Sequence, residues 1–176
     1  MEFTPGFSKT YAVMRTWLYY TSLFFYRKTH YKNMDVIPKG AGIIIAPNHQ
    51  SAFQDAIVAA ALLKKQGRFL VRADVYKNPM ARKALVWFNL LPIYRMRDGI
   101  DSMGNNEQIF KTSEDVILRD EMLVLFPEGN QANKWRLRAL KKGYARIAFG
   151  ALKKAKGHEK IYICLLYTSP SPRDRG

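Results

Sequence analysis

The sequence predicts an α/β fold, with a mostly parallel sheet flanked by helices and an amphipathic helix at the N-terminus. Short apolar runs of strand length alternate along the chain with longer segments of helical periodicity, a pattern typical of a parallel sheet covered on both faces. Three of these runs end in turns that carry charged side chains, as strands do where such a sheet binds ligands. The length of 176 residues fits one domain with its own apolar core.

Five short apolar segments, bounded by turn residues, are expected to form the strands. In chain order they cover 43–46, 68–72, 91–95, 123–126 and a run that begins at 161. Helices are expected between them, over about 52–65, from Pro79 to shortly before Leu91, around the seven-residue repeat of Met103, Phe110 and Ile117, and after Gly143. Strands that alternate with helices in this way form parallel pairs.

The segment from Tyr11 to Tyr26 is rich in aromatic residues and carries one charge, Arg15. It is shorter than the roughly 20 apolar residues that a membrane-spanning helix needs. Basic residues on both sides, Lys9 and Arg27-Lys28, favour a helix that lies in the headgroup zone of a membrane. A helix packed on the protein core is the alternative for an apolar segment of this length.

We expect three regions along the chain. Residues 1–32 would form the membrane-associating helical segment, and residues 33–163 the α/β domain. Residues 164–176 turn abruptly into a Ser/Pro/Arg tail that resembles translated adapter sequence, in which case the natural chain continues past about Ile163. A disordered C-terminus is the alternative. No function is expected in the tail on either interpretation.

The stretch from His49 to Asp55, just after the first strand, is the first candidate for chemistry. The unperturbed pKa of imidazole, roughly 6.5, lies close to neutral pH, so His49 suits the removal of a proton from a substrate hydroxyl. A carboxylate on its other ring nitrogen, from Asp55, would fix the tautomer and stabilise the imidazolium. Two roles stay open for Ser51: a turn or N-cap hydroxyl, which we favour, and a covalent nucleophile. A surface turn with a polar histidine is the alternative for the whole stretch.

Two later turns carry the other candidates. Arg95 ends the third strand, and its planar guanidinium suits a phosphate; a rim arginine paired with Asp98 or Glu128 is the alternative. Glu128 and Gly129 follow the fourth strand. Glu128 is expected to bond a substrate hydroxyl or backbone amides, or else to close a turn. Gly129 is expected to allow close backbone approach or a positive φ.

The three segments that carry these candidate residues, taken in chain order, resemble the glycerolipid acyltransferase family, which includes 1-acylglycerol-3-phosphate acyltransferase. The likeness runs from about residue 36 to about residue 149 and depends on His49 with Asp55, on Arg95, and on Phe126-Pro127-Glu128-Gly129. It implies a membrane-associated acyltransferase that moves a fatty acyl group from a thioester to a hydroxyl of a lysophospholipid, in phospholipid biosynthesis. The expected acceptor is 1-acylglycerol-3-phosphate and the expected product phosphatidate.

The resemblance also implies roles for the candidate residues. His49 would be the general base and Asp55 its orienting partner. The expected substrate-binding residues are Arg95, Glu128, Gly129 and Ser51. No cofactor is implied, because acyl-CoA or acyl carrier protein is the co-substrate. No metal is expected, since the three histidines are scattered and Cys164 is the only cysteine.

The chain departs from the family pattern in two places. The gap from His49 to Asp55 is one residue longer than the commonest spacing. The family often continues Phe-Pro-Glu-Gly with Thr-Arg, where this chain has Asn130-Gln131. The second departure removes a cation from the expected phosphate site. Four downstream residues could replace it: Arg136, Arg138, Lys141 and Lys142.

The charge of the chain agrees with an anionic partner. The 29 Lys and Arg against 14 Asp and Glu give a formal net charge of +15, which steers a protein to phosphate. With the aromatic N-terminal segment, this favours the cytoplasmic face of a phospholipid membrane over nucleic acid. The expected partners are that surface, the thioester donor and the lysophospholipid acceptor. A non-catalytic lipid-binding protein of the same fold and a basic nucleic-acid-binding module stay open as alternatives.

Overall fold

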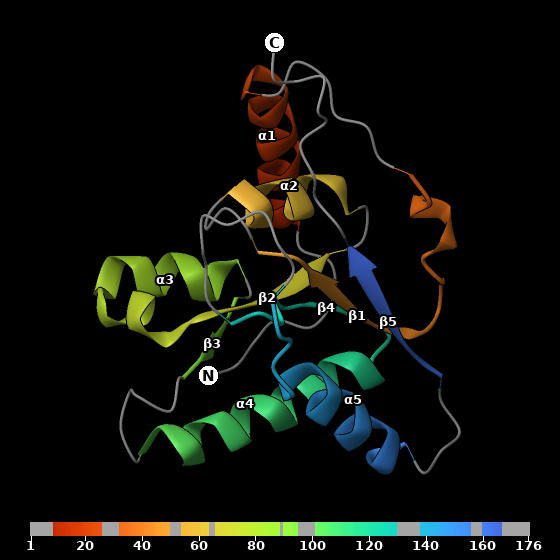
Figure 1. The fold of residues 1–176 in the computed structure, drawn as a ribbon. Helices are drawn as coiled ribbons and strands as arrows, with labels where there is room; N and C mark the ends of the chain where they lie inside the picture. Colours follow the sequence, from red (N-terminus) through yellow and green to blue (C-terminus); the bar gives the residue numbers. More distant parts are fainter. Residues whose placement is uncertain are drawn as a thin grey trace.

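The fold is a parallel sheet between layers of helices (Figure 1). The computed structural model describes residues 9–25, 32–49, 54–63, 66–88, 90–94, 101–129, 138–155 and 160–166. The strands are β1 (Gly42–Pro47), β2 (Gly67–Arg72), β3 (Leu91–Ile93), β4 (Met122–Val124) and β5 (Ile161–Leu166). The helices are α1 (Lys9–Phe25), α2 (Gln54–Leu62), α3 (Pro79–Trp87), α4 (Asp101–Leu118) and α5 (Gly143–Lys154), with short 3-10 turns η1 (Met34–Val36) and η2 (Ala73–Lys77).

The five strands form one sheet in the order β3-β2-β4-β1-β5, and every pair is parallel. The register sets Ile45 of β1 beside Val124, the last residue of β4, and β1 continues in the same direction to Pro47. Their neighbouring turns therefore leave the sheet at the same edge. The predicted α/β class with a mostly parallel sheet is confirmed.

Helices cover both faces of the sheet because its strands are apolar on both sides (Figure 1). Ile44 points into the core beneath α4 and α5, where it meets Ile117 and Ile147. Its neighbours Ile43 and Ile45 point to the opposite core, against α2. The alternation follows from the two-residue period of a strand, and it explains why β1 reads as an unbroken run of isoleucines.

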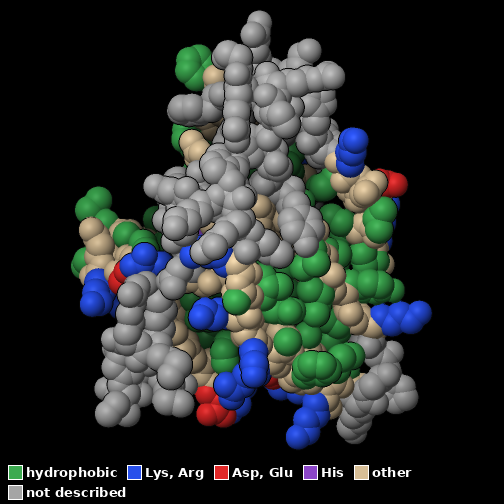
Figure 2. Space-filling view, viewed as in Figure 1, with side chains coloured by type: hydrophobic (Ala, Val, Ile, Leu, Met, Phe, Trp, Pro, Cys, Tyr) green, Lys and Arg blue, Asp and Glu red, His purple; other side chains and the backbone are tan. Residues whose placement is uncertain are grey.

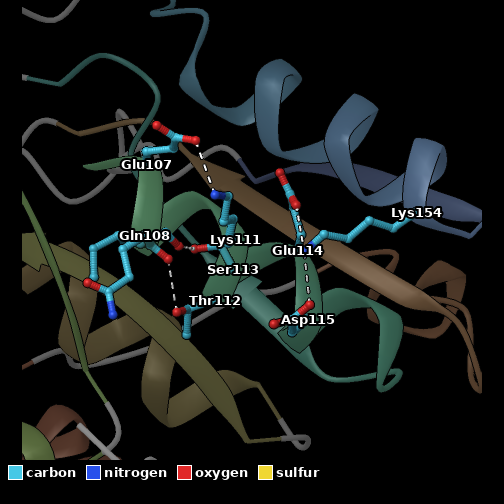
Figure 3. Close-up of polar contacts among 9 residues, drawn as sticks. Glu107, Gln108, Lys111, Thr112, Ser113, Glu114, Asp115 and Lys154 are labelled. Carbon is cyan, nitrogen blue, oxygen red and sulfur yellow. Dashed lines mark hydrogen bonds and ion pairs between the residues drawn. The ribbon is translucent and has the colours of Figure 1, made fainter. Parts of the chain in front are cut away.

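The crossing of α4 and α5 depends on a glycine and a lysine. A Cβ at Gly150 would overlap the carboxylate of Glu114 on α4, so the glycine leaves room for that carboxylate between the two helices. Lys154 places its ammonium 2.9 Å from Glu114 and 3.0 Å from Asp115 (Figure 3). The hydrogen bond to Glu114 is the main cause that raises the pKa of Lys154, and partial burial opposes it.

Helix α1 packs on α2 along one side and exposes aromatic residues along the other. Tyr11 is buried, its hydroxyl lies 3.5 Å from the backbone nitrogen of Gly67, and burial raises its pKa. Arg15 donates to the carbonyl of Leu63 at 3.2 Å. The expectation of a core-packed helix therefore holds for one side of α1. No helix in the described ranges is long and apolar enough to cross a membrane.

The ends of several elements differ from those predicted. β3 ends at Ile93, two residues before Arg95, and α2 begins only at Gln54. β5 continues to Leu166, past the expected boundary at 163, because its last residues pair with β1 as far as Pro47. This edge strand leaves Ile163 and Leu165 exposed, and apolar side chains gather on the surface over it (Figure 2). The start of α3 agrees with the sequence: Pro79 is its first residue, and the side chain of Asn78 caps it.

Candidate active site

The candidate site lies where β1 and β4 end. Asn48 and His49 follow β1 directly, and residues 126–129 form the turn after β4. The backbone nitrogen of Leu125 donates to the carbonyl of Ile45 at 3.1 Å, so the ladder continues to the edge from which both turns leave. Two segments nearly eighty residues apart in sequence are thereby held side by side.

His49 and Asp55 lie within ion-pair distance of each other. Nδ1 of His49 is 3.4 Å from Oδ2 of Asp55, and both side chains are largely buried, at 13% and 10% exposure. Asp55 stands in the first turn of α2, which turns its carboxylate back toward the end of β1. The gap that is one residue longer than the common family spacing therefore still brings the two groups together.

This contact is longer than an ordinary hydrogen bond, which is closer to 2.9 Å. Among the described residues Nδ1 of His49 is buried without a hydrogen-bond partner, although it is within reach of the Asp55 carboxylate. We give more weight to the short separation, because a small rotation of either side chain would complete the bond. With Nδ1 turned to Asp55, Nε2 is the nitrogen left to accept a proton from a substrate.

The imidazole of His49 is held in place by an aromatic ring. It stacks on Phe126 with ring centroids 4.1 Å apart and planes inclined by 24°. Phe126 is the first residue of the turn after β4, so the stacking joins the two halves of the site. The contact with Phe126 limits how far the imidazole can tilt.

Glu128 joins the same two turns through its carboxylate. Its side chain is almost fully buried, at 3% exposure. Oε1 lies 3.5 Å from the backbone nitrogen of His49, a weak contact, and Oε2 accepts from Nε of Arg138 at 2.9 Å. Of the roles expected for Glu128, contact with a backbone amide, that of His49, is the one seen in the structure. Its arginine partner among the described residues is Arg138.

Gly129 ends the turn with a backbone conformation that favours glycine. Its φ is +70°, as the sequence led us to expect for this position, and its nitrogen donates to the carbonyl of Phe126 at 3.1 Å. A Cβ at Gly129 would also lie 3.3 Å from Cγ of Lys141. The backbone nitrogen of Lys141 donates to the carbonyl of Pro127 at 2.7 Å, which holds residues 138–141 beside the turn.

Two predicted site residues, Ser51 and Arg95, lie outside the described residues. The residue before Arg95, Tyr94, is clamped at its backbone: it donates to Oδ1 of Asn106 at 2.9 Å and accepts from Nδ2 at 2.7 Å. β3 is three places from β1 in the sheet, about 14 Å at the usual strand spacing. The end of β3 at Ile93 therefore lies well away from the end of β1.

Arg138 is the residue whose position the sequence did not single out. It was one of four downstream cations, and nothing in the spacing distinguishes it from Arg136. Among the described residues, no group of three or more His, Cys, Asp or Glu side chains could hold a metal ion. His49, Asp55, Glu128 and Arg138 instead form a set suited to proton transfer beside an anion.

Comparison with models of known protein families gives a match over most of the chain. A family model described as Acyltransferase matches residues 28–167, which is most of the chain and includes every residue of the candidate site. No curated protein matches the sequence.

Proposed function

The chain belongs to the acyltransferase family, and from this premise we propose that it moves a fatty acyl group from a thioester to a hydroxyl of a lysophospholipid. The donor would be acyl-CoA or acyl carrier protein, and the acceptor 1-acylglycerol-3-phosphate, giving phosphatidate. The observation that carries the proposal is the 3.4 Å approach of Asp55 to Nδ1 of His49 at the shared edge of β1 and β4.

The residues present account for the chemistry in two proton transfers. Nε2 of His49 takes the proton of the acceptor hydroxyl as its oxygen attacks the thioester carbonyl carbon. The carbon–sulfur bond then breaks, and the departing thiolate takes the proton back from the imidazolium. Asp55 stabilises the imidazolium between the two steps, so His49 is neutral again at the end.

A membrane surface is the proposed place of the reaction, on its cytoplasmic face. The supporting feature is the exposed side of α1, where Val13, Trp17, Tyr20 and Phe24 are 72%, 64%, 65% and 90% exposed. Their spacing of three or four residues puts them on one side of the helix. Aromatic and apolar side chains in this arrangement suit the interface between headgroups and acyl chains, and the net charge of +15 suits anionic lipid.

The direct test of the proposed reaction is thioester cleavage by the purified chain. Release of free thiol from palmitoyl-CoA should depend on added 1-acylglycerol-3-phosphate, and mass spectrometry should detect phosphatidate. Substitution of His49→Ala should lower the rate by about 10²–10⁴-fold, the usual contribution of a general base. Equal turnover by the native and substituted proteins would exclude His49 as the base.

The membrane proposal is tested separately by co-sedimentation with vesicles that contain anionic phospholipid. Replacing Trp17 and Phe24 with Gln should reduce the bound fraction, because two large apolar side chains would no longer enter the interface. The exposed Val75 on η2 provides the control: Val75→Gln should leave binding unchanged. Equal binding by the double variant and the control would refute a role for α1.

A non-catalytic lipid-binding protein of the same fold is the second candidate. It is favoured by the departure from the family pattern after Gly129, where Asn130-Gln131 stands in place of Thr-Arg. Such a protein would bind the vesicles but leave palmitoyl-CoA intact. A basic nucleic-acid-binding module would instead bind oligonucleotides with a steep dependence on salt.

A further inference from the structure

The ring of Phe126 lies face to face with the imidazole of His49. Their centroids are 4.1 Å apart and their planes are inclined by 24°, so one face of the imidazole is covered by an aromatic ring. The turn that holds Phe126 is fixed to β1, because the backbone nitrogen of the preceding Leu125 donates to the carbonyl of Ile45. The stack is therefore set by the pairing of the two central strands.

The ring nitrogens of His49 are directed to other groups. Nδ1 lies 3.4 Å from Oδ2 of Asp55, and Nε2 is left for the substrate hydroxyl. Asp55 thus meets the imidazole at a nitrogen while Phe126 meets it on a face, so the two contacts do not compete. The side chain of His49 is only 13% exposed, and water therefore screens a charge on this ring only in part.

A positive charge over the face of a benzene ring is attracted by its π electrons, at distances up to about 6 Å from the centroid. Neutral imidazole carries no such charge, so this attraction arises only when His49 is protonated. We propose that Phe126 acts through His49 by stabilising its imidazolium with a cation–π interaction. The inference rests on the proposed function, because it is in that reaction that His49 gains a proton.

The proposed reaction shows where this stabilisation would act. The proton of the acceptor hydroxyl passes to Nε2 of His49 while the hydroxyl oxygen bonds to the thioester carbonyl carbon, and the proton later leaves with the departing thiolate. The imidazolium exists only between these two events. A group that stabilises the imidazolium more than the neutral ring lowers the barrier after substrate has bound. Loss of Phe126 should therefore lower kcat and leave KM nearly unchanged.

The charges near the ring leave room for an uncharged contribution. The carboxylate of Glu128 lies 3.5 Å from the backbone nitrogen of His49 through Oε1, but its Oε2 is paired with Arg138. The two charges of that pair offset each other at the imidazole. Among the described residues, Asp55 is then the ionic partner of the imidazolium, and the face of Phe126 supplies a second attraction.

Replacement of Phe126 by pentafluorophenylalanine through nonsense suppression is the test. The fluorinated ring keeps nearly the same size and shape, but fluorine withdraws electron density, so its face no longer attracts a cation. In thiol release from palmitoyl-CoA with 1-acylglycerol-3-phosphate, kcat should fall by about 3- to 30-fold, the effect of one cation–π interaction. KM should stay within about twofold. Phe126→Leu should lower kcat by a similar factor, and Phe126→Tyr, which keeps an electron-rich face, should retain at least about half of the native kcat.

Phe110 provides the matched control. Cζ of Arg146 lies 5.1 Å from the centroid of its ring, so this second cation–π contact joins α4 to α5 away from the candidate site. Pentafluorophenylalanine at position 110 should weaken that contact but leave kcat and KM within about twofold of the native values. The stack itself is checked by NMR: the ring current of Phe126 should shift the carbon-bound ring protons of His49 upfield, and Phe126→Leu should remove that shift.

Three results would overturn the proposal: the chain fluorinated at Phe126 turns over at the native rate, fluorination at Phe110 lowers kcat as much, or the upfield shift at His49 is absent. A loss confined to KM would also overturn it, since that would indicate substrate binding. Failure of the proposed function is a different result. In that case the native chain cleaves no thioester although the upfield shift is present, and the inference falls with the function because no imidazolium forms in a reaction.

Discussion

Glu128→Gln is the substitution that most directly tests how the candidate site is held together. The carboxylate has two oxygens and meets two donors, Nε of Arg138 at 2.9 Å and the backbone nitrogen of His49 at 3.5 Å. Glutamine has the same shape but only one acceptor oxygen. The donor that faces the NH₂ group of the glutamine, either Arg138 or the backbone nitrogen of His49, would lose its acceptor and lie against a second donor.

The free-energy cost follows from burial. Removing one partner of a fully buried ion pair destabilises a protein by about 3–5 kcal/mol. The side chain of Arg138 is 23% exposed, so water recovers part of this, and we expect the free energy of unfolding to fall by about 2–3 kcal/mol. The weak contact to His49 adds about 0.5 kcal/mol at most. For a chain of 176 residues this lowers Tm by about 4–12 °C.

We expect Glu128→Gln to have a larger effect on the turnover rate than on the free energy of unfolding. Without the contacts of the Glu128 carboxylate, the segment that carries His49 is free to shift, and a displacement of about 1 Å lowers the rate on the order of 10²-fold. Tm would be measured by circular dichroism, and turnover by thiol release from palmitoyl-CoA. The matched control is Glu107→Gln on α4, which removes the same charge from a side chain that is 63% exposed and pairs with Lys111 (Figure 3). It should change stability by less than about 0.5 kcal/mol.

The refuting result is a Glu128→Gln protein with the same Tm and turnover as the Glu107→Gln control. A double-mutant cycle with Arg138→Gln refines the test. If the pair contributes as described, the coupling energy should be about 1–3 kcal/mol, in the range of residues in direct contact. A coupling near zero would mean that the ion pair contributes nothing to the folded state.

The remaining predictions concern packing, the base and one exposed ion pair. Gly42→Ala should lower the free energy of unfolding by about 1–3 kcal/mol, because its Cβ would lie 2.6 Å from a backbone oxygen of α4; Gly104→Ala, in an open part of the same helix, should instead be neutral or stabilising by up to about 1 kcal/mol in urea titrations. Asp55→Asn should reduce kcat in the thiol-release assay by about 10²-fold or more, because the imidazolium loses its charged partner; full activity of the variant would exclude the pairing with His49. Lys154→Met should lower Tm slightly, because the ion pair with Glu114 raises the pKa of Lys154 and stabilises the folded chain below about pH 10.5. The difference in Tm from the native protein should shrink as pH rises through that raised pKa. A difference that persists at pH 12 would show that packing, and not the ion pair, is its cause.

The sequence by itself determined the fold class and the order of the elements. Isoleucines at three successive positions, 43–45, indicate a strand buried on both faces, and such strands alternating with helices form a parallel sheet. Pro79 marks the first residue of α3, and Gly129 marks a turn with positive φ. These features depend on neighbours in the chain, so local chemistry is enough to predict them.

The candidate site was only partly accessible to the same reasoning. His49, Asp55 and Glu128 could be named because each follows a strand end, and the carboxyl ends of parallel strands share one edge. Their contacts could not be predicted. The strand order β3-β2-β4-β1-β5 decides which ends are neighbours, and that order depends on long-range packing and not on any local signal. Arg95 illustrates the limit, since β3 lies at the far side of β2 from β4.

Tertiary structure alone decided the role of Glu128 and Arg138. From the sequence, Glu128 was one acidic residue in a turn and Arg138 one cation among four. In the folded chain, the pairing of β1 with β4 brings the backbone of His49 to one carboxylate oxygen, and the return of residues 138–141 along Pro127 brings a guanidinium to the other. A buried carboxylate must find donors for both oxygens, and only the three-dimensional arrangement determines which donors it finds.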